Sequence, residues 1–336
     1  MQLKLQSVGF LTSLIFAAAS LALPQNALAA DDKPISIAVQ YGYAYLPVIV
    51  AEQKGYFAEQ LKAKGFSGKV EIKKISGAPA INDALISGTV DIGAYGLSGM
   101  LIAAEKTKST INIRGVAVLL NGDNGFYTNR ADLKSLKDLN SNDRIAVTST
   151  TGQQGLLLRM AAKKEYDDAR RFDTLMVQLP HPDATSALLA GGSITGYVAN
   201  HPYSDIVGAD PKIHKLFDFS DYFGQRATSA ILATTGKFMK NREGAGEAIF
   251  TGLKEADDFI RNNPKEAAAI FLASEKSPLS PDQIEKMLIS VKDEWSSVPS
   301  GVIAFADFMA ENGLLKNKLQ KWQDVFFEPV ASGTGN

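Results

Sequence analysis

The sequence contains no cysteine among its 336 residues. Disulfide bonds, thiol nucleophiles and thiolate metal ligands are therefore excluded. The same absence excludes a lipid-bearing cysteine after an N-terminal leader, so a mature chain is expected to be soluble.

Long apolar runs are absent after the first thirty residues, so no later segment is expected to span a membrane. Residues 1–30 have one charge, Lys4, then an apolar core at residues 10–19, and end on Ala27-Leu28-Ala29. This pattern predicts a secretory signal peptide at residues 1–30, cleaved after Ala29 or Ala30. The expected location is a bacterial periplasm; the alternative is an uncleaved N-terminal anchor.

An excess of positive charge is also absent. Removing Lys4 with the leader leaves 34 of the 35 basic residues against 36 acidic ones, a net charge of about −2. Nucleic acid and anionic membrane surfaces attract basic proteins, so neither is an expected partner.

Catalytic signatures are missing as well. The carboxylates form no paired constellation, and no order of Ser, His and Asp suggests a catalytic triad. No phosphate-binding loop or dinucleotide fingerprint is present, and no cofactor is predicted. These absences favour binding over catalysis.

Strands alternate with helices along the chain. The first series of strands is expected at residues 35–39, 69–75, 90–94 and 111–120, and a second series begins after residue 122. Helices between strands indicate parallel βαβ units, so the predicted fold is α/β with two doubly wound sheets. Crossovers near Leu120 and Gln225 would form a two-segment hinge with a closing cleft. The expected parts are lobe 1 (residues 31–121 and 226–330), lobe 2 (122–225) and a disordered tail (331–336).

Ligands of such sheets bind beyond the carboxyl ends of the strands. A hydroxyl-rich turn follows the strand at residues 144–147 and precedes a helix, where hydroxyls and backbone N–H groups form a cradle for an anion or polar group. Its candidate contacts are Thr148, Ser149, Thr150, Thr151, Gly152 and Gln153. The alternative role of this turn is helix N-capping.

Other strand ends supply further candidates. Aromatic rings after the first strand would stack on a planar ligand or line an apolar pocket. The candidates here are Tyr41, Gly42 and Tyr43, then Gly77, Ala78 and Ser98 at two helix starts, and Asn121 at the first crossover. The alternatives are inward packing for a tyrosine ring, helix entry for the small residues and a hinge role for Asn121. Arg226, at the second crossover, is expected to form an interlobe salt bridge.

Two of the three histidines, His181 and His201, follow strands of the second lobe, and Tyr197 and Asn200 are nearby. Their side chains would hydrogen-bond a ligand, or alternatively make local hydrogen bonds; no metal site is predicted. If Tyr43 and Tyr197 contact ligand, replacing either by alanine should weaken binding without changing the melting temperature of the empty protein.

Several segments resemble one family when they are taken in order. The segment from Pro47 to Phe57 resembles the P-x-x-x-A-x-x-x-G-Y-F element of periplasmic solute-binding proteins of the nitrate/sulfonate/taurine (NMT1/THI5-like) family. Residues 84–91 resemble its A-L-x-x-G-x-x-D element, and residues 187–197 resemble a second copy with one extra residue and Thr-Gly in place of Asp-Ala.

The resemblance covers essentially the whole mature chain. It implies a type II periplasmic-binding-protein fold that delivers one small molecule to the membrane permease of an ABC importer, and the expected assembly state is a monomer. The ligand is either an oxyanion, such as a sulfonate or nitrate, or a planar aromatic or heterocycle, with an organic molecule that has a polar head favoured. The alternatives are an enzyme on the same fold, similar to pyrimidine synthases or dehydratases, and a sensory binding protein.

Overall fold

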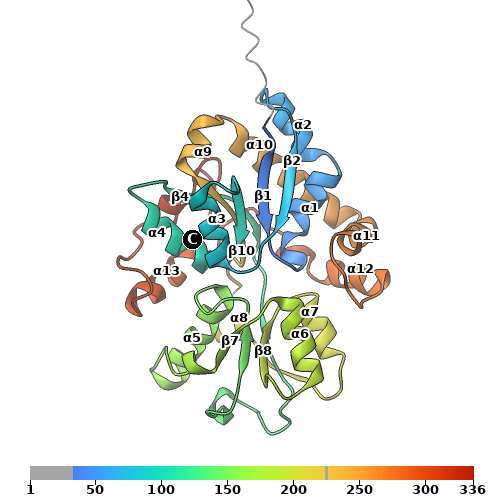
Figure 1. Cartoon of the computed structure of the whole chain (residues 1–336), viewed down its shortest axis with the longest axis vertical. Coiled ribbons are helices and arrows are strands. Elements are labelled where there is room, and N and C mark those ends of the chain that lie inside the picture. The colour runs from blue at the N-terminus through green and yellow to red at the C-terminus, as the bar shows by residue number, and fades with distance from the viewer. Residues whose placement is uncertain (1–32, 224–225) are drawn as a thin grey trace, which may run out of the picture.

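The computed structural model describes residues 33–223 and 226–336. The predicted signal peptide, residues 1–30, lies outside these residues. Within them the chain forms two five-stranded sheets, one above the other along the long axis of the molecule, each flanked by helices (Figure 1). This arrangement confirms the predicted two-lobed α/β fold. The first sheet with its helices is called the first lobe below, and the second sheet with its helices the second lobe.

The first sheet has the order β2-β1-β3-β10-β4. Its strands are β1 (Ile35–Val39), β2 (Val70–Lys74), β3 (Ile92–Tyr95), β4 (Ile113–Leu120) and β10 (Ala230–Thr235). Its helices are α1 (Leu46–Gln53), α2 (Tyr56–Ala63), α3 (Ala78–Ser87), α4 (Leu97–Thr107), α9 (Gly236–Asn241), α10 (Ala245–Asn262), α11 (Pro264–Ser274), α12 (Pro281–Ser290) and α13 (Val302–Glu311).

Successive side chains of β1 face opposite sides of this sheet. Ile35, Ile37 and Val39 pack in one apolar cluster with α1 and α10, whereas Ala38 packs in another with α3 and α4. A strand that is buried on both faces reads as a continuous apolar run, as Ile35–Val39 does.

The second sheet has the order β7-β6-β8-β5-β9. Its strands are β5 (Gly125–Thr128), β6 (Ile145–Val147), β7 (Met176–Gln178), β8 (Gly196–Ala199) and β9 (His214–Asp218). Its helices are α5 (Gln153–Tyr166), α6 (His181–Ala190), α7 (Tyr203–Gly208) and α8 (Phe219–Phe223). Short 3-10 helices are η1 (Tyr43–Tyr45), η2 (Leu136–Asp138), η3 (Asp173–Leu175), η4 (Lys292–Glu294) and η5 (Trp322–Val325).

Each sheet contains antiparallel pairs, which the expectation of purely parallel βαβ units did not include. Strand β10 runs antiparallel to β3 and β4, and β5 runs antiparallel to β8 and β9. Both strands directly follow a crossover between the lobes. The chain enters each sheet at the end that faces the other lobe, so these strands run opposite to their neighbours.

The two crossovers lie side by side. The Asn121 amide donates to the Val298 carbonyl at 3.0 Å and accepts from the Thr228 hydroxyl at 2.9 Å. Asn121 therefore joins one hinge segment to the other, which is the hinge role that the sequence left open. The exact lobe boundaries stay predictions, and Gln225 lies outside the described residues.

The C-terminal residues are held by hydrogen bonds. The backbone N–H of Asn336 donates to Pro299 at 3.2 Å, and its side-chain and backbone oxygens accept from Gly301 at 2.6 Å and Val302 at 3.0 Å. The predicted disordered tail at residues 331–336 is therefore wrong at its last residue, which pairs with backbone groups at the start of α13.

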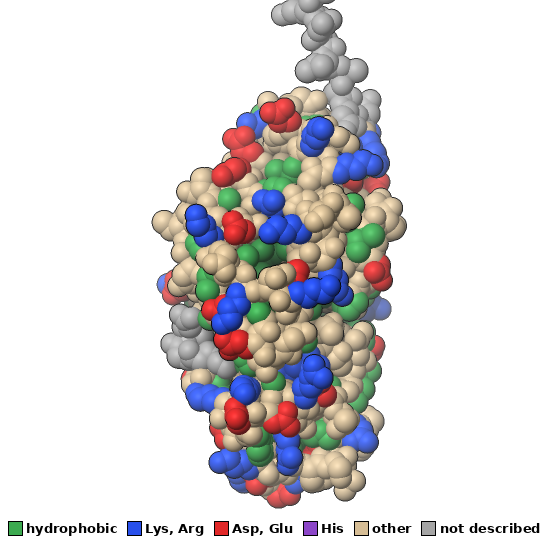
Figure 2. All heavy atoms as spheres, turned by 90° about the vertical axis from the view of Figure 1, so that its left-hand side faces the viewer, with side chains coloured by type: hydrophobic (Ala, Val, Ile, Leu, Met, Phe, Trp, Pro, Cys, Tyr) green, Lys and Arg blue, Asp and Glu red, His purple; other side chains and the backbone are tan. Residues whose placement is uncertain are grey.

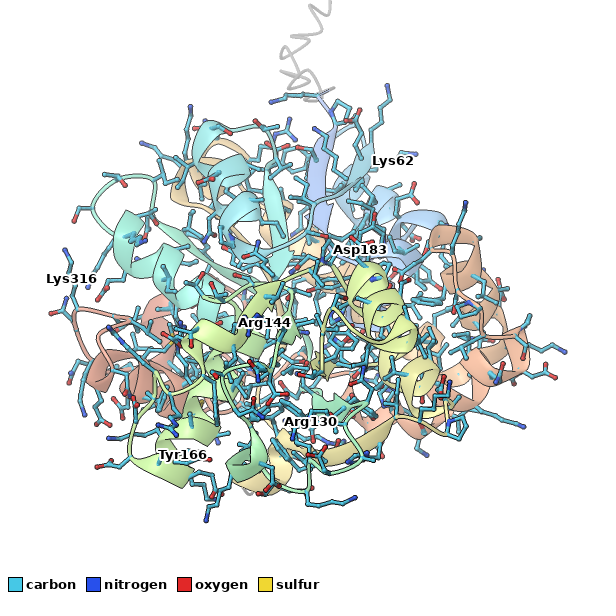
Figure 3. All side chains as sticks on the ribbon, turned by 60° about the horizontal axis from the view of Figure 1, so that its bottom comes forward. Lys62, Arg130, Arg144, Tyr166, Asp183 and Lys316 are labelled. Carbon is cyan, nitrogen blue, oxygen red and sulfur yellow. The ribbon has the colours of Figure 1, made fainter. Side chains whose placement is uncertain are left out.

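Charged side chains cover the outside of the molecule. Lysine and arginine are interspersed with aspartate and glutamate on the face shown in Figure 2. Figure 3 shows Lys62 and Lys316 at the periphery. Arg130, also labelled there, pairs with Asp143 at 2.6 Å and so ties β5 to the loop before β6. Among the described residues, no helix combines the length and the hydropathy of a membrane span.

Candidate functional site

A cavity of about 40 Å³ lies between the two sheets. Both lobes and both crossovers contribute to its wall. The lining residues are Gln40, Tyr41, Ala44, Tyr45, Ala78, Gly96, Asn124, Thr148, Ser149, Gly152, Gln153, Gln154, His181, Asn200 and Ser229. This set is called the polar cavity below.

Four helices begin at the polar cavity, two from each lobe. Ala78 and Gly96 lie at the starts of α3 and α4, and Gln153 and His181 lie at the starts of α5 and α6. None of these helices has a side-chain N-cap. The positive ends of four helix dipoles and their first-turn N–H groups therefore surround one small space, which suits an anionic or strongly polar group.

Charged side chains are absent from the described lining of the cavity, which includes no Asp, Glu, Lys or Arg. His181 is 6% exposed, and burial lowers its pKa from 6.5 to about 3, so its imidazole is neutral at neutral pH. Within the lining itself, the helix ends are therefore the main source of charge.

A buried network in the second lobe holds the polar side chains. Oε1 of Gln154 accepts from the backbone N–H of Thr148 at 2.7 Å and from its hydroxyl at 2.5 Å. Nε2 of Gln154 lies 3.1 Å from the Val198 carbonyl and 3.2 Å from Nε2 of His181. Gln154 therefore connects the hydroxyl-rich turn to α6 and β8.

The network assigns the tautomer of His181. Because Gln154 donates to Nε2, the ring proton lies on Nδ1 and is donated to the Tyr197 hydroxyl. The Tyr197 hydroxyl in turn donates to the His181 carbonyl at 3.4 Å. Tyr203 stacks on the other face of the ring, with centroids 5.0 Å apart and an angle of 6° between the planes. His181 is thus fixed in orientation from three sides.

Contacts across the cleft hold the lobes together. The Tyr203 hydroxyl, from α7 of the second lobe, donates to the carboxylate of Glu275 beyond α11 of the first lobe. Glu275 also accepts from the Gly42 N–H at 2.9 Å and lies 3.5 Å from Nζ of Lys74. A buried carboxylate with three polar partners forms a closing contact at the edge of the cleft.

A second cross-cleft contact is made by Gln153 at the start of α5. Its Oε1 accepts from the backbone N–H of Ser98, in the first turn of α4, at 3.4 Å. A Cβ atom added at Gly96 would lie 2.7 Å from Cβ of Gln153, closer than real Cβ atoms approach. Glycine at position 96 therefore allows the two helix ends to meet.

Eight of the predicted site residues line the polar cavity. They are Tyr41, Ala78, Thr148, Ser149, Gly152, Gln153, His181 and Asn200. Gly77 and Ser98 lie behind the wall: the Gly77 N–H donates to Gln40 at 2.9 Å, and the Ser98 N–H donates to Gln153. The alternative of N-capping by the hydroxyl-rich turn is not observed, because the N-cap of α5 is Gly152.

Two predicted ligand contacts are core residues instead. Tyr43 and Tyr197 are both 0% exposed. The Tyr43 hydroxyl donates to Glu294, and its ring packs edge-on against Trp295, with centroids 5.4 Å apart. The expectation that these rings contact ligand is therefore corrected: they lie behind the wall and support it, and the expected unchanged melting temperature of their alanine variants is withdrawn.

The remaining predicted residues lie elsewhere. Nδ1 of His201 pairs with Asp205 at 2.5 Å, the local contact that the sequence offered as the alternative. Gly42 donates to Glu275, and Asn121 joins the crossovers. Thr150 and Thr151 are absent from the lining of the polar cavity. Arg226 lies 3.5 Å from Glu294, an ion pair between a crossover and the first lobe.

Sequence reasoning missed several lining residues, among them Gln40, Tyr45, Asn124, Gln154 and Ser229. Gln40 had a usable signal, because it directly follows the first strand. Gln154 did not, because a buried glutamine inside a helix has no distinctive pattern. No group of three His, Asp or Glu side chains that could hold a metal ion occurs in the described part of the chain.

Comparison with known families gives one match. Residues 29–273 match the sequence model of the NMT1-like family. No curated protein matches the sequence.

Solved structures share the fold at low sequence identity. The alkanesulfonate-binding protein of Xanthomonas axonopodis pv. citri bound to MOPS is 17% identical, with a TM-score of 0.71 over 89% of this chain and 99% of that one. The periplasmic aliphatic sulphonate binding protein of Escherichia coli is 17% identical, with a TM-score of 0.65 over 89% and 93%. The periplasmic nitrate-binding protein of Synechocystis PCC 6803 is 14% identical, with a TM-score of 0.60 over 77% and 71%.

Proposed function

The chain belongs to the NMT1-like family, and we propose that it is the solute-binding component of an ABC importer that captures a small molecule through an anionic head. The head binds in the polar cavity between the lobes. The closed clamp then delivers its ligand to a membrane permease, and the protein works in the periplasm as a monomer without catalysing a reaction.

One observation carries the proposal. Four helix N-termini, two from each lobe, meet on a cavity whose described lining has no charged side chain. An oxyanion there would accept hydrogen bonds from first-turn N–H groups of both lobes, so its binding would favour closure. A neutral planar molecule would leave the field of the helix ends without a partner.

Other features support transport rather than catalysis. The N-terminal thirty residues have the pattern of a secretory leader, and the solved structures with this fold include proteins described as periplasmic binding proteins for sulphonate and nitrate. The only imidazole on the wall, His181, is held neutral by burial and paired on both ring nitrogens, so it is poorly placed for proton transfer.

A thermal-shift screen of the purified protein tests the proposal. The probes are nitrate, methanesulfonate, butanesulfonate and benzenesulfonate, each paired with a neutral analogue such as butanol or benzyl alcohol, together with a set of pyrimidines. A ligand that binds only the native state adds about 2.7 kcal/mol of stability at a hundredfold excess over its Kd. We expect shifts with anions and none with their neutral analogues.

Shifts confined to pyrimidines would replace the anionic head with a planar heterocycle. Chemical conversion of a probe, detected by mass spectrometry after incubation, would overturn the proposal in favour of an enzyme.

A further inference from the structure

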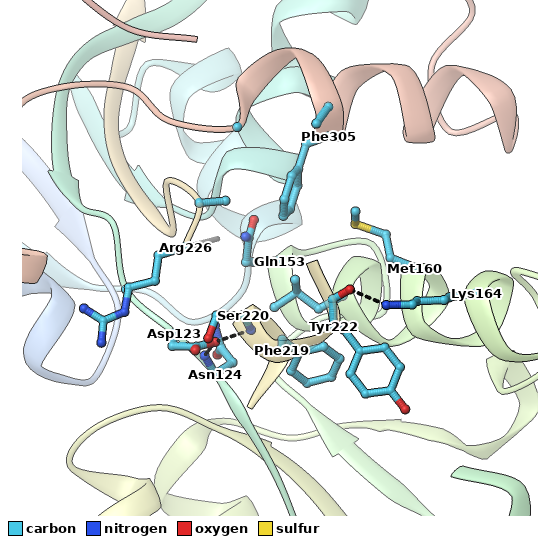
Figure 4. A pocket seen from close by; sticks show the side chains of 15 residues that line it. Asp123, Asn124, Gln153, Met160, Lys164, Phe219, Ser220, Tyr222, Arg226 and Phe305 are labelled. Carbon is cyan, nitrogen blue, oxygen red and sulfur yellow. Dashed lines mark hydrogen bonds between the residues drawn. The ribbon is translucent and has the colours of Figure 1, made fainter. Parts of the chain in front are cut away.

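A second and larger cavity shares part of its wall with the polar cavity and is lined by residues of both crossovers; Figure 4 shows it from close by. Its volume is about 350 Å³, within the usual range of small-ligand pockets. Helices α5 and α8, the crossovers and α13 enclose it. Its apolar wall consists of Leu157, Met160, Phe219, Ala227, Ala304 and Phe305. These residues define the hinge-side cavity.

The polar groups around the hinge-side cavity already have partners. Nζ of Lys164 donates to the Tyr222 carbonyl at 2.6 Å. The carboxylate of Asp123 accepts from the backbone N–H groups of Asn124 at 2.7 Å and Ser220 at 3.1 Å. The guanidinium of Arg226 points away from the aromatic rings (Figure 4), and its Nη1 lies 3.5 Å from Oε1 of Glu294. The part of the wall that an occupant could contact is therefore mainly apolar.

The two cavities share Gln153 and Asn124 in their walls. Gln153 is the side chain between them. Its Oε1 accepts the Ser98 N–H at 3.4 Å, at the long end of hydrogen-bond distances, so the contact is weak. This oxygen also occupies the N-terminus of α4, where an oxygen of an anionic head would accept the same N–H.

We propose that the two cavities are compartments of one ligand site and that the Gln153 side chain is a movable partition between them. The head of the ligand replaces the Gln153 carbonyl oxygen at the helix ends, and its apolar body lies in the hinge-side cavity. The inference rests on the proposed function and specifies its ligand: an amphipathic anion with a compact head and an apolar body.

Size supports the second compartment. While Gln153 is in place, the polar cavity, at about 40 Å³, is much smaller than the hinge-side cavity, at about 350 Å³. A ligand of several carbons requires more space, and the hinge-side cavity is the adjoining space with an apolar wall. Burying a body there would remove it from water together with the exposed parts of Met160 and Ala304.

Isothermal titration with the straight-chain sulfonates from methane- to hexanesulfonate, and the matching carboxylates, tests the inference. Each methylene group that enters the hinge-side cavity should tighten binding about fourfold, which corresponds to ~0.8 kcal/mol. The increase should stop when the compartment is full. Ala304→Trp fills the hinge-side cavity from its exposed edge and should flatten this dependence.

A matched control is Ala269→Trp. Ala269 is also an exposed alanine in a helix of the first lobe, and it lies outside both cavities. The affinity of the Ala269→Trp variant should therefore increase with ligand chain length as it does in the wild type. Gln153→Ala removes the partition and should improve hexanesulfonate binding relative to methanesulfonate binding.

The outcomes separate the two claims. Measurable methanesulfonate binding with no gain along the series would overturn the two-compartment site and leave anion capture standing. An equal loss of chain-length dependence in both tryptophan variants would also overturn it, because the effect would not come from the cavity. Failure of every sulfonate and carboxylate would overturn the inference, and failure of nitrate as well would overturn the proposed function.

Discussion

The two lobes contribute different chemistry to the polar cavity. At the helix starts, the first lobe presents Ala78 and Gly96, so it offers mainly backbone N–H groups. The second lobe presents Thr148, Gln153 and His181, whose side chains are amide, hydroxyl and imidazole groups. The first lobe therefore lets a ligand approach its backbone N–H groups closely. The second lobe supplies most of the side-chain groups that would distinguish one ligand from another.

The supporting contacts differ in the same way. Second-lobe side chains depend on the buried network of Gln154, His181 and Tyr197. The first lobe has a smaller network, in which Gln40 accepts from the Gly77 N–H at 2.9 Å and donates to the Tyr45 hydroxyl at 3.0 Å. Mutations in the second-lobe network should therefore affect stability and binding together, while mutation of Tyr41, a first-lobe wall residue outside the Gln40–Tyr45 pair, should affect mainly binding.

The largest effect is expected for Tyr197→Ala. It removes a large, fully buried ring and a partner of His181, so it should lower the free energy of unfolding by about 3–5 kcal/mol. Tyr41→Ala, on the first-lobe wall, should lower it by about 1 kcal/mol or less. Urea unfolding of the empty protein measures both. Equal losses in the two variants would contradict the difference between the lobes.

The pH dependence of stability should differ in sign between the lobes. Burial lowers the pKa of His181 in the second lobe from 6.5 to about 3, and burial raises the pKa of Asp257, in α10 of the first lobe, from 3.8 to about 7. Between pH 3.8 and 6.5 the unfolded chain binds the proton at His181, which lowers stability as the pH falls. The folded protein binds it at Asp257, which raises stability as the pH falls. Each slope is about 1.4 kcal/mol per pH unit, so the two cancel.

Replacing one of the two groups should reveal the pH dependence of stability that the other group contributes. Relative to the wild type, the free energy of unfolding of Asp257→Asn should fall by about 1.4 kcal/mol per pH unit as the pH is lowered from 6.5 to 4. That of His181→Gln should rise by about as much. Urea unfolding at half-unit pH steps gives the difference curves. Parallel curves for wild type and variants would mean that neither group changes its protonation between the folded and unfolded states in this range.

A smaller effect is expected at the closing contact. Tyr203→Phe removes the cross-cleft hydrogen bond to the Glu275 carboxylate and should cost about 1.5–3 kcal/mol, the usual value for a bond to a charged group. The empty protein should also open, which small-angle scattering would detect as a larger radius of gyration. The matched control is Tyr222→Phe, because the Tyr222 hydroxyl bonds Glu165 at 3.4 Å within the second lobe. An equal expansion in both variants would show that the cross-cleft bond does not hold the lobes closed.

The smallest effect is expected within the hydroxyl-rich turn. Thr148→Val removes the hydroxyl that donates to Gln154 and should weaken methanesulfonate binding about fivefold, or about 1 kcal/mol. Thr151→Val, in the same turn but outside the polar cavity, should leave binding unchanged. Calorimetric titration of both variants tests this, and equal weakening would return Thr151 to the ligand site.

Local sequence patterns were sufficient where one segment decides its own structure. The apolar run at Ile35–Val39 and the turn after Val147 predicted a strand and a helix start, and both are present. The rule that ligands bind beyond strand ends led to Ser149 and His181, which line the polar cavity. The same patterns could not distinguish Tyr41 from Tyr43, because three closely spaced tyrosines in a turn carry no indication of which ring faces the core.

The sequence by itself therefore determined the two-lobed α/β class, the order of most of its strands and helices and the helix starts that face the cleft, because these depend on residues a few positions apart; it missed α7, β9 and α8. Only the tertiary structure decided the direction of β5 and β10 and the hydrogen bonds of Tyr43 with Glu294 and Tyr203 with Glu275. Each of these depends on segments far apart in the chain that meet only when the lobes pack, so no local pattern records them.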